Sequence, residues 1–165
     1  MTLTIINNAD PVFTSTAITN ATVGTAYTYN VVATDADGDA LTFTGTTIPS
    51  WLTLTDNGNN TATLSGTPIA GGTYNVVITV DDGNGGTETQ SFDITVPFPP
   101  KTYVPDDNFE AYLEANSMGD GIANNDSVLT AEVAALTSLN VDNQSIADLT
   151  GVEDFANIAA LRCEN

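Results

Sequence analysis

The clearest set of residues with the means to do chemistry is the acidic turn Asp35-Ala36-Asp37-Gly38-Asp39. Its three carboxylates alternate around a glycine, so their oxygens can be directed at one centre. Calcium takes six to eight hard oxygen ligands, and carboxylates are its usual protein donors. Gathered carboxylates repel one another in the absence of a cation. The spacing therefore predicts a calcium site, and the alternative is an ordinary acidic hairpin turn.

Other residues that could carry chemistry favour structural roles. Residues 119–126 are rich in oxygen donors, but they lack the spacing and final glutamate of an EF-hand and are interpreted as a polar loop. Trp51 could stack on carbohydrate, but its place at the start of a predicted strand favours packing. Cys163 is interpreted as a core thiol. Lys101 lies outside the predicted strands, which argues against an isopeptide bond to asparagine.

The composition removes most catalytic chemistry. The 165 residues include no histidine, one cysteine and two basic residues against 21 acidic ones, a net charge of −19. Without histidine the chain lacks the commonest general base and zinc ligand. A strongly negative surface also repels nucleic acid and anionic membranes. We therefore expect a protein that is not an enzyme, with no nucleic-acid partner.

The given sequence shows neither the pattern of a membrane-spanning segment nor that of a signal peptide. No run of about 18 apolar residues predicts a membrane span, so we expect no membrane insertion. The first residues lack the basic region and the small-residue cleavage site of a signal peptide. If the protein is secreted, we expect its signal to lie upstream of this sequence.

Strands must position the acidic turn, because apolar and polar residues alternate up to about residue 98. The alternation is clearest in residues 27–33, 74–80 and 92–96, with shorter runs at 41–44, 51–54 and 61–64. Glycine, asparagine and aspartate mark the turns between these runs. About seven strands in about 90 residues predict an antiparallel β-sandwich over residues 1–98.

The pattern becomes helical after a proline-rich stretch. Residues 99–101 are predicted to form a semi-rigid linker, since proline cannot continue a sheet. Pro105 and the acidic residues after it predict the start of a helix, with Phe109 and Leu113 on one face. Thr130 is expected to be the N-cap of a second short helix.

The end of the sequence repeats itself after 22 residues. The corresponding positions are Leu136, Leu139, Val141 and Asn143 in the first copy and Ile158, Leu161, Cys163 and Asn165 in the second. This period and the form L-x-x-L-x-L/C-x-x-N are those of a leucine-rich repeat, which stacks its turns into a solenoid.

Several short motifs occur in order between residues 7 and 96. They are Asn8-Ala9-Asp10-Pro11-Val12-Phe13, Ala33–Phe43, Pro49-Ser50-Trp51-Leu52, Leu64-Ser65-Gly66-Thr67-Pro68 and Val80-Asp81-Asp82-Gly83. In this combination they resemble the cadherin-like and immunoglobulin-like modules of bacterial surface proteins. The resemblance implies that Asp81 and a lead-in segment with Asn7, Asn8 and Asp10 join Asp35, Asp37 and Asp39 around calcium. The lead-in segment departs from the usual Asp-Asn-x-Pro, so one structural Ca²⁺ is expected.

The segments Thr102–Asp106 and Leu149–Phe155 resemble the opening of leucine-rich-repeat regions in secreted proteins of the Bacteroidetes type. This resemblance covers residues 102–165 and implies a small α/β N-terminal cap with a first repeat, so the whole chain is expected to be mainly β.

Such proteins are large, modular and exported. The resemblances together imply an extracellular, secreted or cell-surface adhesion module, in which a calcium-stiffened spacer presents a repeat surface to a protein or glycan ligand. The alternatives are an accessory region of a secreted polysaccharide-degrading enzyme and a self-assembling fibre subunit joined through an open solenoid edge.

Overall fold

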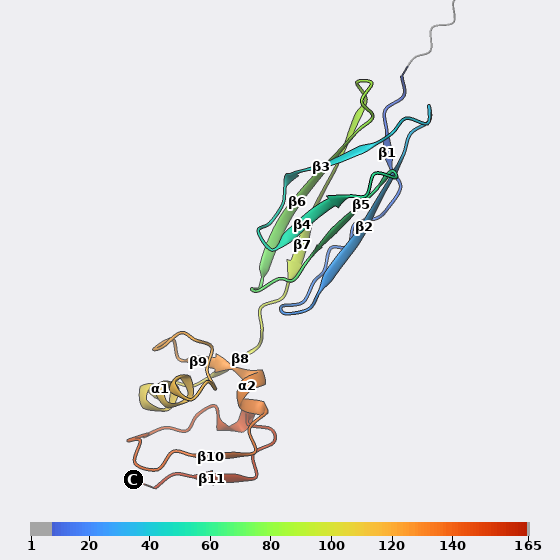
Figure 1. Cartoon of the computed structure of the whole chain (residues 1–165). Helices are drawn as coiled ribbons and strands as arrows, with labels where there is room; N and C mark the ends of the chain where they lie inside the picture. Colours follow the sequence, from blue (N-terminus) through green and yellow to red (C-terminus); the bar gives the residue numbers. More distant parts are fainter. Residues whose placement is uncertain (1–7, 165) are drawn as a thin grey trace, which may run out of the picture. The chain divides into compact units, whose positions relative to one another are not determined.

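The computed structural model describes residues 8–164 (Figure 1). The chain divides into two compact units, residues 1–98 (unit 1) and residues 99–165 (unit 2). Each unit has its own cluster of buried apolar side chains.

Unit 1 is a sandwich of two antiparallel sheets. The first sheet has the order β1-β2-β5-β4, with β1 (Val12–Phe13), β2 (Tyr27–Thr34), β5 (Thr61–Gly66) and β4 (Leu52–Asp56). The second has the order β3-β6-β7, with β3 (Thr42–Thr47), β6 (Gly72–Asp81) and β7 (Thr87–Val96). The predicted mainly β antiparallel sandwich is confirmed over the described residues.

The two sheets face each other through side chains at alternate positions. In β6 the side chains of Val76, Ile78 and Val80 are fully buried, as are Val31 in β2 and Leu64 in β5. Successive residues of a strand point to opposite faces, so the residues between them face solvent. Burying each such apolar side chain stabilises the fold by about 1.5–3 kcal/mol. The packed sheets leave the loops gathered at the two poles of the sandwich (Figure 1).

Trp51 packs within unit 1, as the sequence predicts. Its ring lies edge-on to Tyr27 at 5.9 Å and to Tyr74 at 5.5 Å between ring centroids. Its indole Nε1 is buried and has no hydrogen-bond partner among residues 8–164. Edge-to-face pairs place the positive edge of one ring against the negative face of another, so these two contacts add to the packing of Trp51.

Unit 2 contains an antiparallel strand pair, short helices and a parallel strand pair. The antiparallel pair is β8 (Lys101–Tyr103) with β9 (Ser127–Leu129), and the parallel pair is β10 (Ser138–Asn140) with β11 (Ala160–Arg162). The helical elements are α1 (Asp107–Ala115), α2 (Thr130–Ala134) and the 3-10 turn η1 (Val152–Asp154). Within the described part of the chain, every helix is too short or too polar to span a bilayer.

The first predicted helix is confirmed, and the second differs at its start. Helix α1 begins after Pro105, and the Asp106 side chain caps it by accepting from the N–H groups of its first turn. Thr130 was expected to cap α2, but it is the first helical residue, and Leu129 occupies the N-cap position without a side-chain hydrogen bond. The Thr130 hydroxyl instead accepts a hydrogen bond from Thr102 at 3.0 Å.

The predicted linker, residues 99–101, is shorter in the structure. Its last residue, Lys101, is the first residue of β8.

Strands β10 and β11 pair residues that lie 22 positions apart, such as Leu139 with Leu161. The two leucines differ in environment: Leu139 is 4% exposed and Leu161 is 41% exposed. The expectation that Cys163 is a core thiol is wrong, because its side chain is exposed. The physical reason is that β11 covers β10 on one side, while β11 itself is an edge strand.

Candidate metal site

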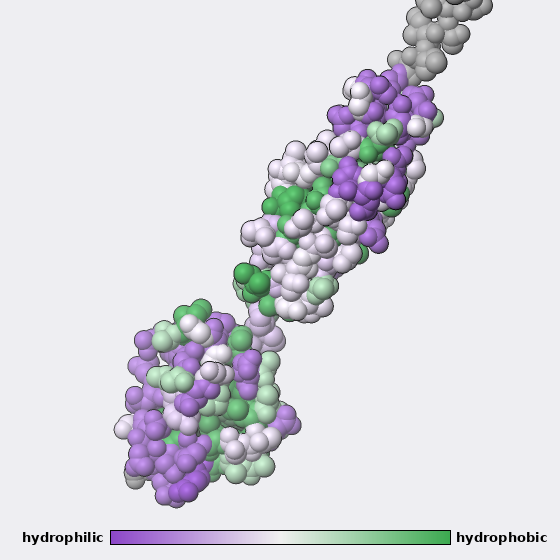
Figure 2. Space-filling view, in the orientation of Figure 1, coloured by the Kyte–Doolittle hydropathy of each residue, from purple (hydrophilic) through white to green (hydrophobic). Residues whose placement is uncertain are grey.

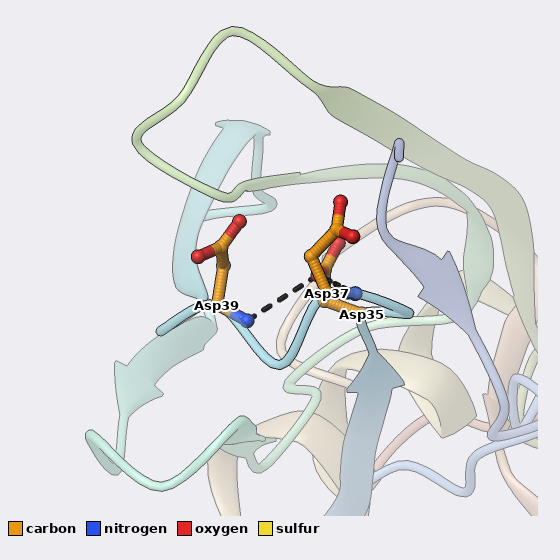
Figure 3. Close-up of side chains that lie close together, drawn as sticks. All are labelled: Asp35, Asp37 and Asp39. Atoms are coloured by element: carbon orange, nitrogen blue, oxygen red, sulfur yellow. Dashed lines mark hydrogen bonds between the residues drawn. The ribbon is translucent and has the colours of Figure 1, made fainter. Parts of the chain in front are cut away.

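The acidic turn forms the loop between β2 and β3. Asp35 Oδ1 accepts hydrogen bonds from Asp37 N at 2.8 Å and Asp39 N at 3.3 Å, which curls the loop around it (Figure 3). Gly38 has a φ of +82°, a left-handed conformation that costs glycine little. The three aspartates each offer a carboxylate oxygen, and these oxygens lie within 4.8 Å of one another. The local fold therefore gathers the three predicted ligands.

The environment of this cluster disfavours uncompensated carboxylates. Asp35 Oδ2 is buried and has no hydrogen-bond partner among residues 8–164. A buried acceptor left unpaired costs about 1–3 kcal/mol, and more when it is charged. Residues 1–98 contain nine acidic residues and no lysine or arginine. No basic side chain of unit 1 is therefore present to neutralise the cluster.

The lead-in segment Asn8–Asp10 lies beside the acidic turn. Ala9 N donates to Asp37 Oδ2 at 2.8 Å. The Asn8 side chain donates to Asp82 Oδ2 at 2.7 Å, in the loop between β6 and β7. A methyl group added at Gly86 would lie 2.9 Å from Asp10 Oδ1 and 3.1 Å from Asn8 Nδ2. The segment thus brings Asn8 and Asp10 to the same pole as the acidic turn, and Asn7 lies outside the described residues.

The structure separates the roles of Asp81 and Asp82. Asp81 is exposed, and its Oδ1 accepts from Gly83 N at 2.7 Å. Asp82 is only 3% exposed, and it is the carboxylate that contacts the lead-in segment. The alternation of side chains along a strand explains the difference. Asp82 follows Ile78 and Val80 at every second position, so it lies on the same buried face, whereas Asp81 lies on the opposite face. The alternation of β6 is the sequence signal by which Asp82 could have been found.

Asp82 is held in its ionised form by its neighbours. Desolvation by itself raises the pKa of Asp82, but the Asn8 side chain and the N–H groups of Asn84, Gly86 and Gly85 outweigh it and hold the pKa below its usual value. Figure 2 shows that strongly hydrophilic residues gather at this pole of unit 1, while paler residues cover its middle. The pole is therefore an oxygen-rich, negatively charged surface.

A second acidic group in unit 2 has a structural explanation. Asp107, Glu110 and Asp126 offer carboxylate oxygens within 4.8 Å of one another. Glu110 is fully buried, and its two oxygens accept from Asn125 N at 3.0 Å and Asp126 N at 3.1 Å. Glu114, one turn along α1, accepts from the same loop at Asp120 N and Gly121 N. These glutamates fasten residues 119–126, which form a polar loop as predicted.

Lys101 has a related role that the sequence did not reveal. Its Nζ lies 2.6 Å from Asp120 Oδ2, whose side chain is 3% exposed, so β8 is joined to the loop by an ion pair. Desolvation by itself raises the pKa of Asp120, but the hydrogen bonds from Lys101 and Asn125 outweigh it and lower the pKa. Lys101 therefore neutralises a nearly buried carboxylate.

Residues 10–97 match the model of the family described as "Putative Ig domain" (He_PIG). The chain belongs to this family. The He_PIG domain covers the whole sandwich, from the lead-in segment to the end of β7. Its immunoglobulin-like character agrees with the two antiparallel sheets described above.

Several solved structures are similar to the chain. Endo-fucoidan hydrolase MfFcnA4 from glycoside hydrolase family 107 shares 34% identity over 56% of this chain, with a TM-score of 0.45. The SrpA adhesin from Streptococcus sanguinis shares 16% identity over 67% of this chain and 75% of its own, with a TM-score of 0.48. The PKD domain of an M14-like peptidase from Thermoplasmatales archaeon SCGC AB-540-F20 shares 26% over 55% of this chain and 99% of its own, with a TM-score of 0.41.

The chain spans only 14% of the length of the fucoidan hydrolase. No curated protein matches the chain.

The acidic pole of the He_PIG domain fits a hard divalent cation. Asp35, Asp37 and Asp39 supply carboxylate oxygens from one loop, and one Asp35 oxygen is buried without a donor among residues 8–164. Magnesium demands near-ideal octahedral geometry, whereas calcium accepts flexible sets of six to eight oxygens. The donors of the acidic turn are therefore of the hard-oxygen type that calcium takes, with Asp82 in a neighbouring loop.

Proposed function

We propose that the chain is a non-catalytic extracellular interaction module, bacterial in type, whose He_PIG domain is a calcium-stiffened spacer. The observation that carries the proposal is the buried Asp35 Oδ2, which lies among gathered carboxylates and has no donor among the described residues. In this proposal Asp35, Asp37 and Asp39 hold one Ca²⁺, with Asn8, Asp10 and Asp82 beside them. The ion supplies positive charge to a unit that has no basic side chain.

The stiffening follows from where the ligands come from. Asp37 belongs to the loop after β2 and already accepts a hydrogen bond from Ala9 N of the lead-in segment. Asn8 binds Asp82, which belongs to the loop after β6. An ion that tightens the first loop therefore also restrains the lead-in segment and, through it, the second loop. The predicted ligand Asp81 lies in the same loop region, where its Oδ1 accepts from Gly83 N of its own hairpin.

For unit 2 we propose the N-terminal cap and first repeat of a leucine-rich-repeat region, over residues 102–165. Support comes from the parallel pairing of β10 with β11 at the 22-residue offset of the sequence repeat. Further support comes from Asn143 N, which donates to Glu164 O at 2.7 Å beyond the strands and continues the stacking. Solenoids bind ligands along the face that their stacked strands form, and a protein or glycan on a cell surface is the proposed partner.

An unstacked repeat edge should be measurable in solution. A repeat buries its apolar face mainly against its neighbours, so we expect fast amide hydrogen exchange at Ile158, Leu161 and Cys163. Slow exchange is expected in residues 74–80, at the centre of the He_PIG sandwich. Exchange followed by mass spectrometry, on a sample shown to be monomeric by light scattering, tests this. Equal protection of both segments in the monomer contradicts an open repeat edge.

The same light-scattering experiment tests the fibre alternative. A self-assembling subunit joined through β11 should form larger species as concentration rises, whereas the proposed module stays monomeric. An open edge strand presents unpaired backbone groups and is the natural place for such assembly. The charge of −19 on each copy opposes it at low ionic strength.

The purified chain is expected to show no turnover of polysaccharide, ester or peptide substrates. Hydrolysis near neutral pH needs a tuned acid and base, an activated nucleophile or a metal-bound water. The chain has no histidine, and its one thiol, Cys163, is exposed just after β11. Reducing-end and chromogenic assays test this expectation. Cleavage that is lost when one Asp or Glu is changed to its amide contradicts the non-catalytic assignment.

A binding experiment distinguishes an accessory region of a polysaccharide-degrading enzyme from a module that adheres to a protein ligand. A module that serves a polysaccharide-degrading enzyme should retain affinity for that polysaccharide without cleaving it. Affinity electrophoresis of the whole chain in gels containing neutral or acidic polysaccharides measures this directly. Retardation in one polysaccharide, without cleavage, favours the accessory role over adhesion to a protein ligand.

A further inference from the structure

Residues 14–21, here called the crossing segment, run from one sheet of unit 1 to the other. Near its start, Ser15 N donates to Val32 O of β2 at 3.3 Å. Near its end, Thr95 N of β7 donates to Thr19 O at 2.8 Å. The crossing segment is therefore an edge neighbour first of β2 and then of β7, and its backbone hydrogen bonds join the two sheets.

A ring of hydrogen bonds holds the crossing segment where it leaves β2. Ser15 Oγ lies 2.7 Å from the Tyr29 hydroxyl, and this hydroxyl donates to Gln90 Oε1 at 2.8 Å. Gln90 Nε2 donates back to Ser15 O at 3.1 Å and closes the ring. Tyr29 belongs to β2 and is 2% exposed, whereas Gln90 belongs to β7. The ring therefore connects the segment to both sheets in a part-buried environment that strengthens its hydrogen bonds.

The direction of the crossing segment decides how it responds to tension. Asn20 pairs with Thr95 in parallel, so the segment and β7 run the same way. The chain enters unit 1 at one pole, and β7 leads to the opposite pole (Figure 1). Tension along the chain pulls the segment from its N-terminal end and β7 from its C-terminal end.

These two pulls have opposite directions along a common axis. Hydrogen bonds between neighbouring strands lie across that axis. The hydrogen bonds between the crossing segment and β7 are consequently loaded together, in shear. If both ends of the chain left unit 1 from the same pole, these bonds would break one after another. Residues 14–21 thus lie on the path that carries the load from β1 to β7.

We propose that the crossing segment is a mechanical clasp, whose bonds to β2 and β7 allow the He_PIG domain to resist tension along the chain. Forced unfolding is governed by the unfolding rate, so contacts that break in the transition state set the lifetime under load. This goes beyond the spacer role proposed above, because it concerns force and needs no calcium.

Constant-force spectroscopy of the whole chain, held by its two ends, tests the clasp. Unfolding of the He_PIG domain should lengthen the chain by about 30 nm and unfolding of unit 2 by about 20 nm, so the two events are distinguishable. Ser15→Ala and Gln90→Met each remove hydrogen bonds of the ring. Each should shorten the lifetime of the He_PIG event about tenfold at a given force. Unchanged lifetimes in both variants overturn the proposal.

Val80→Ala is the matched control, because it weakens the buried core in β6 at a position whose strand partners, Phe43 and Glu88, lie outside the ring. We expect this variant to lower the melting temperature while changing the lifetime under load by less than about threefold, since core contacts away from the clasp affect it less. An equal effect of Val80→Ala and the ring variants overturns the proposal. All measurements are made with a chelator present, so failure of the calcium proposal leaves the result unaffected.

Discussion

Several millimolar Ca²⁺ is expected to raise the melting temperature of unit 1 by about 5–10 °C. Extracellular calcium modules bind with Kd values of about 10⁻⁴–10⁻³ M. Binding to the folded state alone adds RT ln(1 + [L]/Kd), about 1.4 kcal/mol at tenfold excess over Kd and about 2.7 kcal/mol at a hundredfold. One kcal/mol shifts the melting temperature of a domain of this size by about 4–8 °C. Trp51 is the only tryptophan and lies in unit 1, so its fluorescence follows this unit.

Single substitutions locate the ion within unit 1. Asp37→Ala and Asp35→Asn should abolish the calcium shift, and the second keeps an acceptor for the turn N–H groups while removing the charge. Asp82→Asn should reduce the shift more than Asp81→Asn, because only Asp82 contacts the lead-in segment. Asp93→Asn, exposed on β7 and bonded to Asn75, is the charge-matched control and should keep the full shift. Identical melts with chelator, calcium and magnesium contradict the site.

Asp106→Ala is expected to destabilise unit 2 by about 2–4 kcal/mol. Asp106 Oδ1 accepts from Asn108 N and Phe109 N, both at 3.0 Å, and so caps α1. Its Oδ2 accepts from Ala147 N at 2.8 Å and Asp148 N at 3.0 Å, far along the chain. One carboxylate thus joins the start of the helix to the loop between β10 and η1. Its removal leaves four backbone donors without their partner.

Urea unfolding followed by the NMR amide signals of α1 measures this loss. Asp107→Ala is the matched control, because Asp107 is the exposed neighbour, and it should lose less than about 1 kcal/mol. Trp51 fluorescence in the same titration should be unchanged in both variants. A similar loss in the two variants contradicts the joining role of Asp106.

Because of the Asp106 carboxylate, we expect the stability of unit 2 to fall at low pH. Desolvation by itself raises the pKa of Asp106, but the backbone N–H donors, with Ala147 first, outweigh it and lower the pKa in the folded state. A lowered pKa gives stability that is fully present above the unfolded-state pKa of about 4 and is lost as pH falls through the folded-state pKa. Acid titration of wild type should therefore destabilise unit 2 below about pH 4 more steeply than in Asp106→Ala.

The strands of unit 1 could be predicted because their pattern is local. Alternation in residues 74–80 marks a half-buried strand wherever its partner lies, and Pro105 with Asp106 marks a helix start in the same way. The acidic turn could also be predicted, because its three aspartates are close in the sequence and the loop only has to curl around Asp35. The predictions that failed depended on neighbours distant in the sequence.

Thr130 illustrates such a failure. Its type suits an N-cap, but Thr102 supplies a hydrogen-bond donor from β8, and the helix begins one residue earlier. Cys163 has the residue type and register of a core position, yet it is exposed, because β10 is the one described strand that pairs with β11. Local propensity is a weak guide wherever a tertiary neighbour competes for the same group.

The amino-acid sequence by itself determined that this protein has a β-sandwich, a separate second unit with a 22-residue repeat, and an acidic turn without basic partners. These features rest on periodicity and composition, which need no knowledge of partners in space. Only the tertiary structure decided that Asp82 rather than Asp81 joins the lead-in segment, and that Ser15, Tyr29 and Gln90 meet in a ring. Both depend on which strands become neighbours, and strand pairing is set by the burial of whole faces rather than by any single residue.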